Sequence, residues 1–214
     1  MYTKISDNLN RILTFAAKFN PTIIAVSKYY TVREMEEAYK VGLNNFGENK
    51  VLDAIEKINL MEEEIASKSH YHLIGHLQSN KVKKAVGVFD LIHSVDSLKL
   101  AVEIDNVAKQ KGIIQKILIQ VNNANEEQKF GIAPSHLEEL IEKINVLQNV
   151  RLEGLMTIAP LTDDETLLRK LFCEMYQLKE KFHLKELSMG MSNDYKIALE
   201  EGATMIRLGR TLFE

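Results

Sequence analysis

The sequence predicts a single (β/α)8 barrel of the TIM type with one additional helix at its N-terminus. Three observations support this fold class. Short apolar runs alternate with longer amphipathic patterns, eight of the runs have the length and composition of strands, and 214 residues lie at the small end of the range for such barrels. No linker, low-complexity run or shift in composition divides residues 1–214, so we expect one domain.

The predicted elements begin with an amphipathic helix, in which Ile5, Leu9 and Ile12 lie on one face. Strand candidates follow, several of them rich in Ile, Val and Leu on both faces, as strands covered on both sides by helices should be. They are Thr22–Lys28, Asn44–Gly47, His70–Gly75, Leu91–Val95, Gln115–Val121, Leu152–Thr157, Glu186–Met189 and Thr204–Leu208.

The helices between these strands carry recognisable start and stop signals. Three of them are predicted to begin with a capping box, in which a Ser or Thr and a Glu three residues later satisfy backbone donors. The boxes are Thr31 with Glu34, Ser135 with Glu138, and Thr162 with Glu165. Three glycines stand where a left-handed residue ends a helix, namely Gly42, Gly112 and Gly202.

A doubly wound open sheet is the structural alternative. Such a sheet usually carries a glycine-rich turn after its first strand, whereas residues 27–31 here read Ser-Lys-Tyr-Tyr-Thr. The sequence therefore favours the barrel.

Composition excludes several classes of function. A net charge of −3 argues against nucleic acid as the main partner, and no apolar run is long enough to span a bilayer. The N-terminal residues lack the apolar segment of a signal peptide. Cys173 is the only cysteine, which rules out an intrachain disulfide and a cysteine-rich zinc site. We expect a cytoplasmic protein.

Lys28 is a candidate functional residue because it closes the first predicted strand. Functional groups of such barrels gather at the C-terminal ends of the strands. A partly desolvated lysine there is nucleophilic towards aldehydes and can form a Schiff base. The alternative is a lysine at the end of a strand whose ammonium group simply reaches into solvent.

The last two predicted strands end in residues that suit a phosphate group. Residues 188–194 read Ser-Met-Gly-Met-Ser-Asn-Asp and lead from a strand into a helix, and Arg207, Gly209 and Arg210 end the last strand. Hydroxyls, a glycine and helix N–H groups together bind phosphates, and barrels often place such a site after strands 7 and 8. The alternative is that the glycines only form turns and that Arg207 makes a surface ion pair.

His70 and His72 alternate on one predicted strand and could in principle hold a metal ion. A third ligand at suitable spacing is missing, so we interpret them as packed or hydrogen-bonded histidines and expect no metal site. Asn49 follows the second predicted strand and lies near the same barrel mouth as Lys28.

Taken together, these segments resemble the pyridoxal phosphate homeostasis proteins, which are related to the barrel domain of bacterial alanine racemase. The similarity extends over nearly the whole chain, and the order and spacing of its motifs make it specific. The motifs are Ala25-Val26-Ser27-Lys28, Phe46-Gly47-Glu48-Asn49, His72-Leu73-Ile74-Gly75, Leu77-Gln78-Ser79-Asn80-Lys81, Gly154-Leu155-Met156, Leu187-Ser188-Met189-Gly190-Met191-Ser192 and Arg207-Leu208-Gly209.

The resemblance implies a protein that holds pyridoxal 5′-phosphate (PLP) as a Schiff base on Lys28 and takes part in vitamin B6 homeostasis. It also implies that Ser188, Gly209 and residue 210 lie around the phosphate. Residue 210 is often a small hydroxyl residue in the family. Arg210 would replace that hydroxyl contact by a charge-assisted one.

The same resemblance implies that Arg207 faces the pyridine nitrogen and that Asn49 lies near the cofactor ring. Three functions remain to be compared: a homeostatic PLP carrier, a minimal PLP-dependent amino-acid racemase, and an aldolase or phosphate-sugar isomerase. The carrier is favoured, because racemases add a β-rich domain that supplies an opposing base and the third function leaves most motifs unexplained. We expect no efficient turnover, a monomer, and PLP-dependent apoenzymes as partners.

Overall fold

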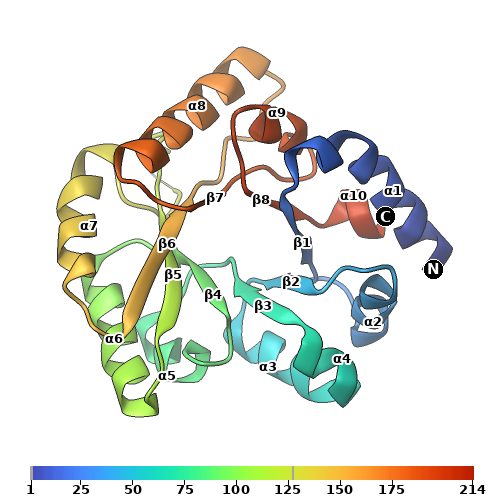
Figure 1. The fold of residues 1–214 in the computed structure, drawn as a ribbon, viewed down its shortest axis with the longest axis horizontal. Helices are drawn as coiled ribbons and strands as arrows, with labels where there is room; N and C mark the ends of the chain where they lie inside the picture. The colour runs from blue at the N-terminus through green and yellow to red at the C-terminus, as the bar shows by residue number, and fades with distance from the viewer. Residues whose placement is uncertain (1, 127) are drawn as a thin grey trace.

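The computed structural model describes residues 2–126 and 128–214, and their strands close into a parallel barrel (Figure 1). Each strand pairs with the next along the chain, and β1 also pairs with β8. This arrangement confirms the predicted (β/α)8 fold. The strands are β1 Thr22–Val26, β2 Asn45–Glu48, β3 His70–Leu73, β4 Leu91–Val95, β5 Gln115–Gln120, β6 Val150–Met156, β7 Glu186–Ser188 and β8 Met205–Leu208.

Helices surround the barrel on its outside and connect successive strands (Figure 1). The predicted additional helix, α1, precedes β1 and packs beside the last helix, where the Asn8 side-chain amide donates to the Leu212 carbonyl at 3.1 Å. The helices are α1 Tyr2–Ala16, α2 Val32–Lys40, α3 Val51–Leu60, α4 Glu63–Lys68, α5 Val82–Ala85, α6 Leu98–Lys111, α7 Leu137–Asn145, α8 Glu165–Lys181, α9 Tyr195–Glu200 and α10 Arg210–Phe213. Short 3-10 helices lie at Ala17–Phe19, Ser79–Lys81 and Pro134–His136.

All eight predicted strands are present, with small differences at their ends. The first was expected to include Lys28 but ends at Val26, so Lys28 lies in the following turn, where Tyr30 N donates to Ser27 O at 2.9 Å. The second extends one residue further than predicted, to Glu48. These ends decide which side chains reach the barrel mouth.

Only one of the three predicted capping boxes is correct. Thr31 accepts from Glu34 N, and the Glu34 carboxylate accepts from Thr31 N. The box at Ser135 is wrong because Pro134 starts a 3-10 turn and α7 begins only afterwards. The box at Thr162 is wrong because Asp164 caps α8 directly.

The three glycines expected at helix ends have the left-handed backbone that only glycine adopts freely. Their φ angles are +96° at Gly42, +66° at Gly112 and +93° at Gly202. Among the described helices, none is long and apolar enough to cross a membrane.

The apolar side chains of the described residues form two separate clusters. The large cluster lies between the strands and the surrounding helices. The small one fills part of the barrel interior and consists of Ile24, Leu91, Leu118, Met156 and Met205. Several buried polar side chains occur on the same strands, so the barrel is only partly filled by apolar groups. These buried polar side chains lie below the site at the barrel mouth.

Candidate functional site

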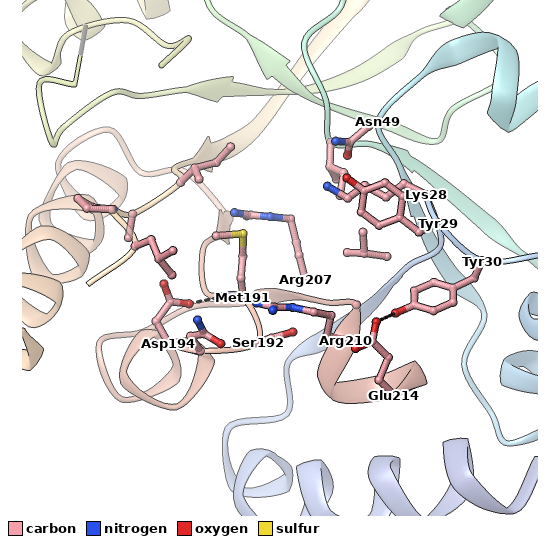
Figure 2. Close-up of a pocket in the computed structure, with 18 of the residues that line it drawn as sticks. Lys28, Tyr29, Tyr30, Asn49, Met191, Ser192, Asp194, Arg207, Arg210 and Glu214 are labelled. Carbon is pink, nitrogen blue, oxygen red and sulfur yellow. Dashed lines mark hydrogen bonds between the residues drawn. The ribbon is translucent and has the colours of Figure 1, made fainter. Parts of the chain in front are cut away.

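A cavity of about 620 Å³ opens at the C-terminal ends of the strands, a size typical of cofactor sites (Figure 2). Its walls come from the C-terminal ends of β1, β2, β3, β6, β7 and β8 and the segments that follow them. Five of the six residues predicted for the site line it, namely Lys28, Asn49, Arg207, Gly209 and Arg210. Because the C-terminal ends of parallel strands meet at one barrel mouth, residues far apart in sequence converge here.

Lys28 enters the cavity from the turn after β1 and is half-buried. Its Nζ lies 4.7 Å from the centre of the Tyr29 ring, a distance at which the ring face attracts an ammonium group. Tyr29 is itself 83% exposed, so the lysine contacts a ring that faces solvent. The amine is thus inside the cavity and still reachable from solvent.

A buried ion pair holds the ends of β1 and β2 beside Lys28. Lys57 Nζ lies 2.8 Å from Glu48 Oε1 and donates to Ser27 O at 2.6 Å. The Ser27 hydroxyl donates to the same carboxylate oxygen at 2.8 Å. Ser27 and Glu48 immediately precede Lys28 and Asn49, so this cluster fixes the backbone from which both side chains leave.

Asn49 is held by a close contact with Gly75. A Cβ atom at position 75 would lie 2.3 Å from the Asn49 carbonyl oxygen, which no side chain can tolerate. The glycine of the His72–Gly75 motif is therefore required by the backbone of Asn49 rather than by a ligand.

Arg207 leaves β8 and lies beneath the cavity, 4% exposed. Its Nη1 donates to Ser188 Oγ at 2.7 Å, and its Nη2 donates to Thr157 O at 2.8 Å. Burial lowers the pKa of Arg207 to about 10, against a smaller opposing effect of Asp194. The guanidinium remains protonated at neutral pH, and both of these contacts are to neutral oxygens.

Ser188, which the sequence analysis expects around the phosphate, lies inside the barrel. The residue is the last of β7, its side chain is fully buried inside the barrel, and it does not line the cavity. Its hydroxyl contacts Arg207 and His93, at 2.7 and 3.0 Å. Because side chains alternate along a strand, Ser188 points into the barrel, below the mouth.

The second serine of the same motif, Ser192, lines the cavity instead. Its Oγ accepts from Thr211 N at 3.3 Å, and the Thr211 hydroxyl donates to Ser192 O at 3.4 Å. These bonds join the segments after β7 and β8 and bring Ser192 beside Gly209 and Arg210. A Cβ atom at Gly209 would meet its nearest neighbours, on Val26, only at 3.6 Å, so the fold itself does not demand a glycine there.

Two acidic residues that the sequence analysis did not select also line the cavity. Asp194 accepts from Met191 N at 2.5 Å, and burial raises its pKa. Glu214 accepts from the Tyr30 hydroxyl at 3.0 Å, and burial together with this bond raises the pKa of Tyr30 to about 12. Figure 2 shows Asp194 and Glu214 on the side of the cavity away from Asn49. Both lie outside strands, so periodicity gives no signal for them.

The histidines of β3 do not face a common ligand. His72 is buried and hydrogen-bonded to Asn45 and His93, both at 3.0 Å, whereas His70 is exposed and lies 3.4 Å from Asp90. His72 is thus packed inside the barrel, and His70 lies at the surface beside Asp90. Within the described residues, no group of three or more His, Cys, Asp or Glu side chains is arranged to hold a metal ion.

Comparison with known families matches residues 2–214 to the family described as alanine racemase, N-terminal domain. A relative from Aquifex aeolicus, named pyridoxal phosphate homeostasis protein, is 39% identical over 197 residues. The aligned region covers 89% of this chain and 85% of the relative.

Solved structures agree with this match. PipY of Synechococcus elongatus with PLP bound is 37% identical, with a TM-score of 0.87 over 98% of this chain and 100% of PipY. The structure of PipY without PLP has a TM-score of 0.90. Alanine racemase of Clostridium difficile is 16% identical with a TM-score of 0.80, over 98% of this chain and 56% of the racemase, which shows a shared fold alone.

Proposed function

The chain belongs to the pyridoxal phosphate homeostasis protein family, and from this premise we propose that it binds PLP as a Schiff base on Lys28 and serves intracellular vitamin B6 homeostasis. The observation that carries the proposal is the single cavity shared by the Lys28 amine, the buried Arg207 guanidinium and the turn at Gly209. PLP is bound in the related PipY structure.

The residues of the cavity fit the chemistry of this cofactor. PLP supplies an aldehyde that a primary amine captures reversibly. Lys28 offers the amine, and Arg207 offers N–H groups that suit an unprotonated pyridine nitrogen, because a guanidinium can only donate. We assign the cofactor ring to Asn49 as well, which lines the cavity beside Lys28 (Figure 2).

For the phosphate we propose Ser192, Gly209 and Arg210. The Ser192 hydroxyl and the backbone at Gly209 lie at the joined ends of β7 and β8, and the exposed Arg210 side chain adds a positive charge. Ser188 contributes indirectly in this proposal, through Arg207, because its hydroxyl is used inside the barrel.

This arrangement predicts that Arg210→Ala weakens PLP binding but leaves the binding of pyridoxal, which lacks the phosphate, unchanged. A hydrogen bond to a charged group contributes about 1.5–3 kcal/mol, so the dissociation constant for PLP should rise by roughly one to two powers of ten. Absorbance titration of the purified protein with each compound measures both constants. Arg33→Ala, which removes an exposed arginine on α2, is the control. Equal losses for PLP and pyridoxal in Arg210→Ala would refute this phosphate site.

We further propose that the protein is a carrier without efficient turnover of amino acids. Its relatives are named for homeostasis, and inversion at an α-carbon needs an acid/base group on each face of the cofactor. Arg207 would also keep the pyridine nitrogen unprotonated, which raises the barrier to forming the α-carbanion and slows proton exchange on either face. Lys28 can serve one face. Tyr29 and Tyr30 follow it directly, on the same side of the cavity, and the Asp194 carboxylate is engaged by the Met191 amide.

Incubation of PLP-loaded protein with single-enantiomer alanine in deuterated water should therefore give slow or undetectable α-deuterium incorporation. Mass spectrometry and chiral chromatography follow the isotope and the configuration. A purified alanine racemase, run in parallel, shows that the conditions support exchange. Racemisation at about one event per second or faster, which is within the usual enzyme range, would favour a minimal racemase instead.

The proposal includes one domain over residues 1–214, a monomeric state and a cytoplasmic location. It also includes delivery of PLP to PLP-dependent apoenzymes. Light scattering of the purified protein measures its oligomeric state. Transfer of PLP to an apoenzyme can be followed by the recovery of that enzyme's activity.

A further inference from the structure

Five buried or half-buried polar side chains form a continuous row through the barrel interior, which we call the polar row. Arg207 Nη1 lies 2.7 Å from Ser188 Oγ, which lies 3.0 Å from His93 Nδ1. His93 Nε2 lies 3.0 Å from His72 Nδ1, and His72 Nε2 lies 3.0 Å from Asn45 Oδ1. Ser188 on β7 and His93 on β4 are not on neighbouring strands, so the bond between them crosses the barrel.

The two ends of the polar row fix the direction of its hydrogen bonds. At one end, the Arg207 guanidinium can only donate, so Ser188 Oγ accepts. At the other end, the Asn45 amide nitrogen donates to Asn44 Oδ1 at 2.9 Å, which turns its oxygen towards His72. His72 Nε2 must therefore carry a hydrogen and donate.

The histidines between these ends are neutral at neutral pH. Burial lowers the pKa of His72 to about 4 and that of His93 well below its usual value, and their mutual proximity and Arg207 lower the latter further. A neutral imidazole has one donor and one acceptor. With Nε2 of His72 donating, its Nδ1 accepts from His93 Nε2, and His93 Nδ1 accepts from the Ser188 hydroxyl. Every bond then points from Arg207 towards Asn45.

The polar row gives Arg207 a fixed acceptor without neutralising its charge. Ser188 accepts from Arg207 with one lone pair and has its own hydrogen used by His93, so its hydroxyl cannot rotate away. Thr157 O holds the second Nη group at 2.8 Å. A guanidinium has five N–H groups, which leaves three of them after these two bonds.

We propose that Ser188 and His93 are positioning residues, which orient the Arg207 guanidinium through the polar row so that its remaining N–H groups face the cofactor. The orientation of Arg207 is a property of the protein without cofactor. Only its effect on PLP affinity rests on the function proposed above.

Nuclear magnetic resonance of 15N-labelled protein tests the orientation, with and without PLP. Long-range 15N–1H correlation should show His72 and His93 as neutral Nε2–H tautomers at pH 7, and Arg207 should give separate, slowly exchanging Nη signals. Ser188→Ala and His93→Phe should both merge the Arg207 signals. A Nδ1–H or charged form of either histidine in the wild type, or unchanged Arg207 signals in Ser188→Ala, would overturn the proposal.

PLP titration gives the second measurement. Ser188→Ala should weaken PLP binding about tenfold. The double variant Ser188→Ala with His93→Phe should bind PLP as tightly as Ser188→Ala alone, because His93 acts through Ser188. Ser94→Ala is the matched control, since Ser94 is equally buried and its hydroxyl has no partner among the described residues. Equal affinities of Ser188→Ala and Ser94→Ala would contradict the proposal. If the wild type itself binds no PLP, the proposed function fails, while the resonance signals still decide whether the polar row orients Arg207.

Discussion

Replacing Lys28 by Ala should abolish the covalent attachment of PLP completely. The Lys28 amine lines the cavity and is reachable from solvent. In the wild type, an absorbance band of the Schiff base should disappear on addition of borohydride, and the fixed cofactor should be found on the peptide that contains Lys28. Lys28→Ala should show neither the band nor the modified peptide. Any remaining PLP would be held without a covalent bond and should leave the protein on gel filtration.

A second lysine substitution separates this effect from a general loss of positive charge. Lys81→Ala removes a lysine from a 3-10 helix at the same end of the barrel, outside the cavity, and should retain the band and the modified peptide. A wild-type protein that stays colourless in excess PLP would refute the proposed function. Modification of another lysine in Lys28→Ala, at the level seen in the wild type, would refute the assignment of Lys28.

The fold and most of the cavity could be predicted because they depend on short-range patterns. Alternation of apolar runs with amphipathic segments gives parallel strands joined by helices, and parallel strands place all their C-terminal ends at one mouth. Lys28, Asn49 and Gly209 each follow a strand closely. Their convergence therefore required only the order of the strands and no knowledge of the loops between them.

Short-range patterns do not predict which of Ser188 and Ser192 faces the cavity. Both belong to one motif and both carry hydroxyls, but β7 ends at Ser188 itself. The end of a strand is hard to place within one or two residues, and one residue decides whether a side chain points into the barrel or away from it. The expectation that Ser188 lies around the phosphate stays a prediction, and in this structure its hydroxyl is bonded to Arg207 and His93 inside the barrel.

The cluster behind Lys28 could not be predicted either, because its members look ordinary in sequence. Lys57 reads as a surface lysine of an amphipathic helix, and Glu48 as a polar residue at a strand end. Only the packing of α3 against the barrel brings the ammonium group to 2.8 Å from the Glu48 carboxylate. The same holds for His93, which occurs singly in β4 and gains a role only through partners on other strands.

Replacing Lys57 by Met should lower the free energy of unfolding by about 3–5 kcal/mol, a large share of the usual total for a domain. The Glu48 side chain is 3% exposed, so without Lys57 its charge stays buried with only the Ser27 hydroxyl as a partner. Removing one partner of a buried pair costs more than the pair itself contributes, because the remaining charge is uncompensated. Urea unfolding of the PLP-free protein, followed by circular dichroism, measures the change.

Lys50→Met is the matched control, because Lys50 and Asp53 are both exposed and lie 3.8 Å apart. An exposed pair of this kind contributes about 0–1 kcal/mol, so this variant should unfold almost like the wild type. The double variant Glu48→Leu with Lys57→Met should recover a large part of the lost stability, since it leaves no buried charge. If Lys57→Met and Lys50→Met unfolded at the same urea concentration, the Glu48–Lys57 pair would not hold the ends of β1 and β2, and the placement of Lys28 would need another cause.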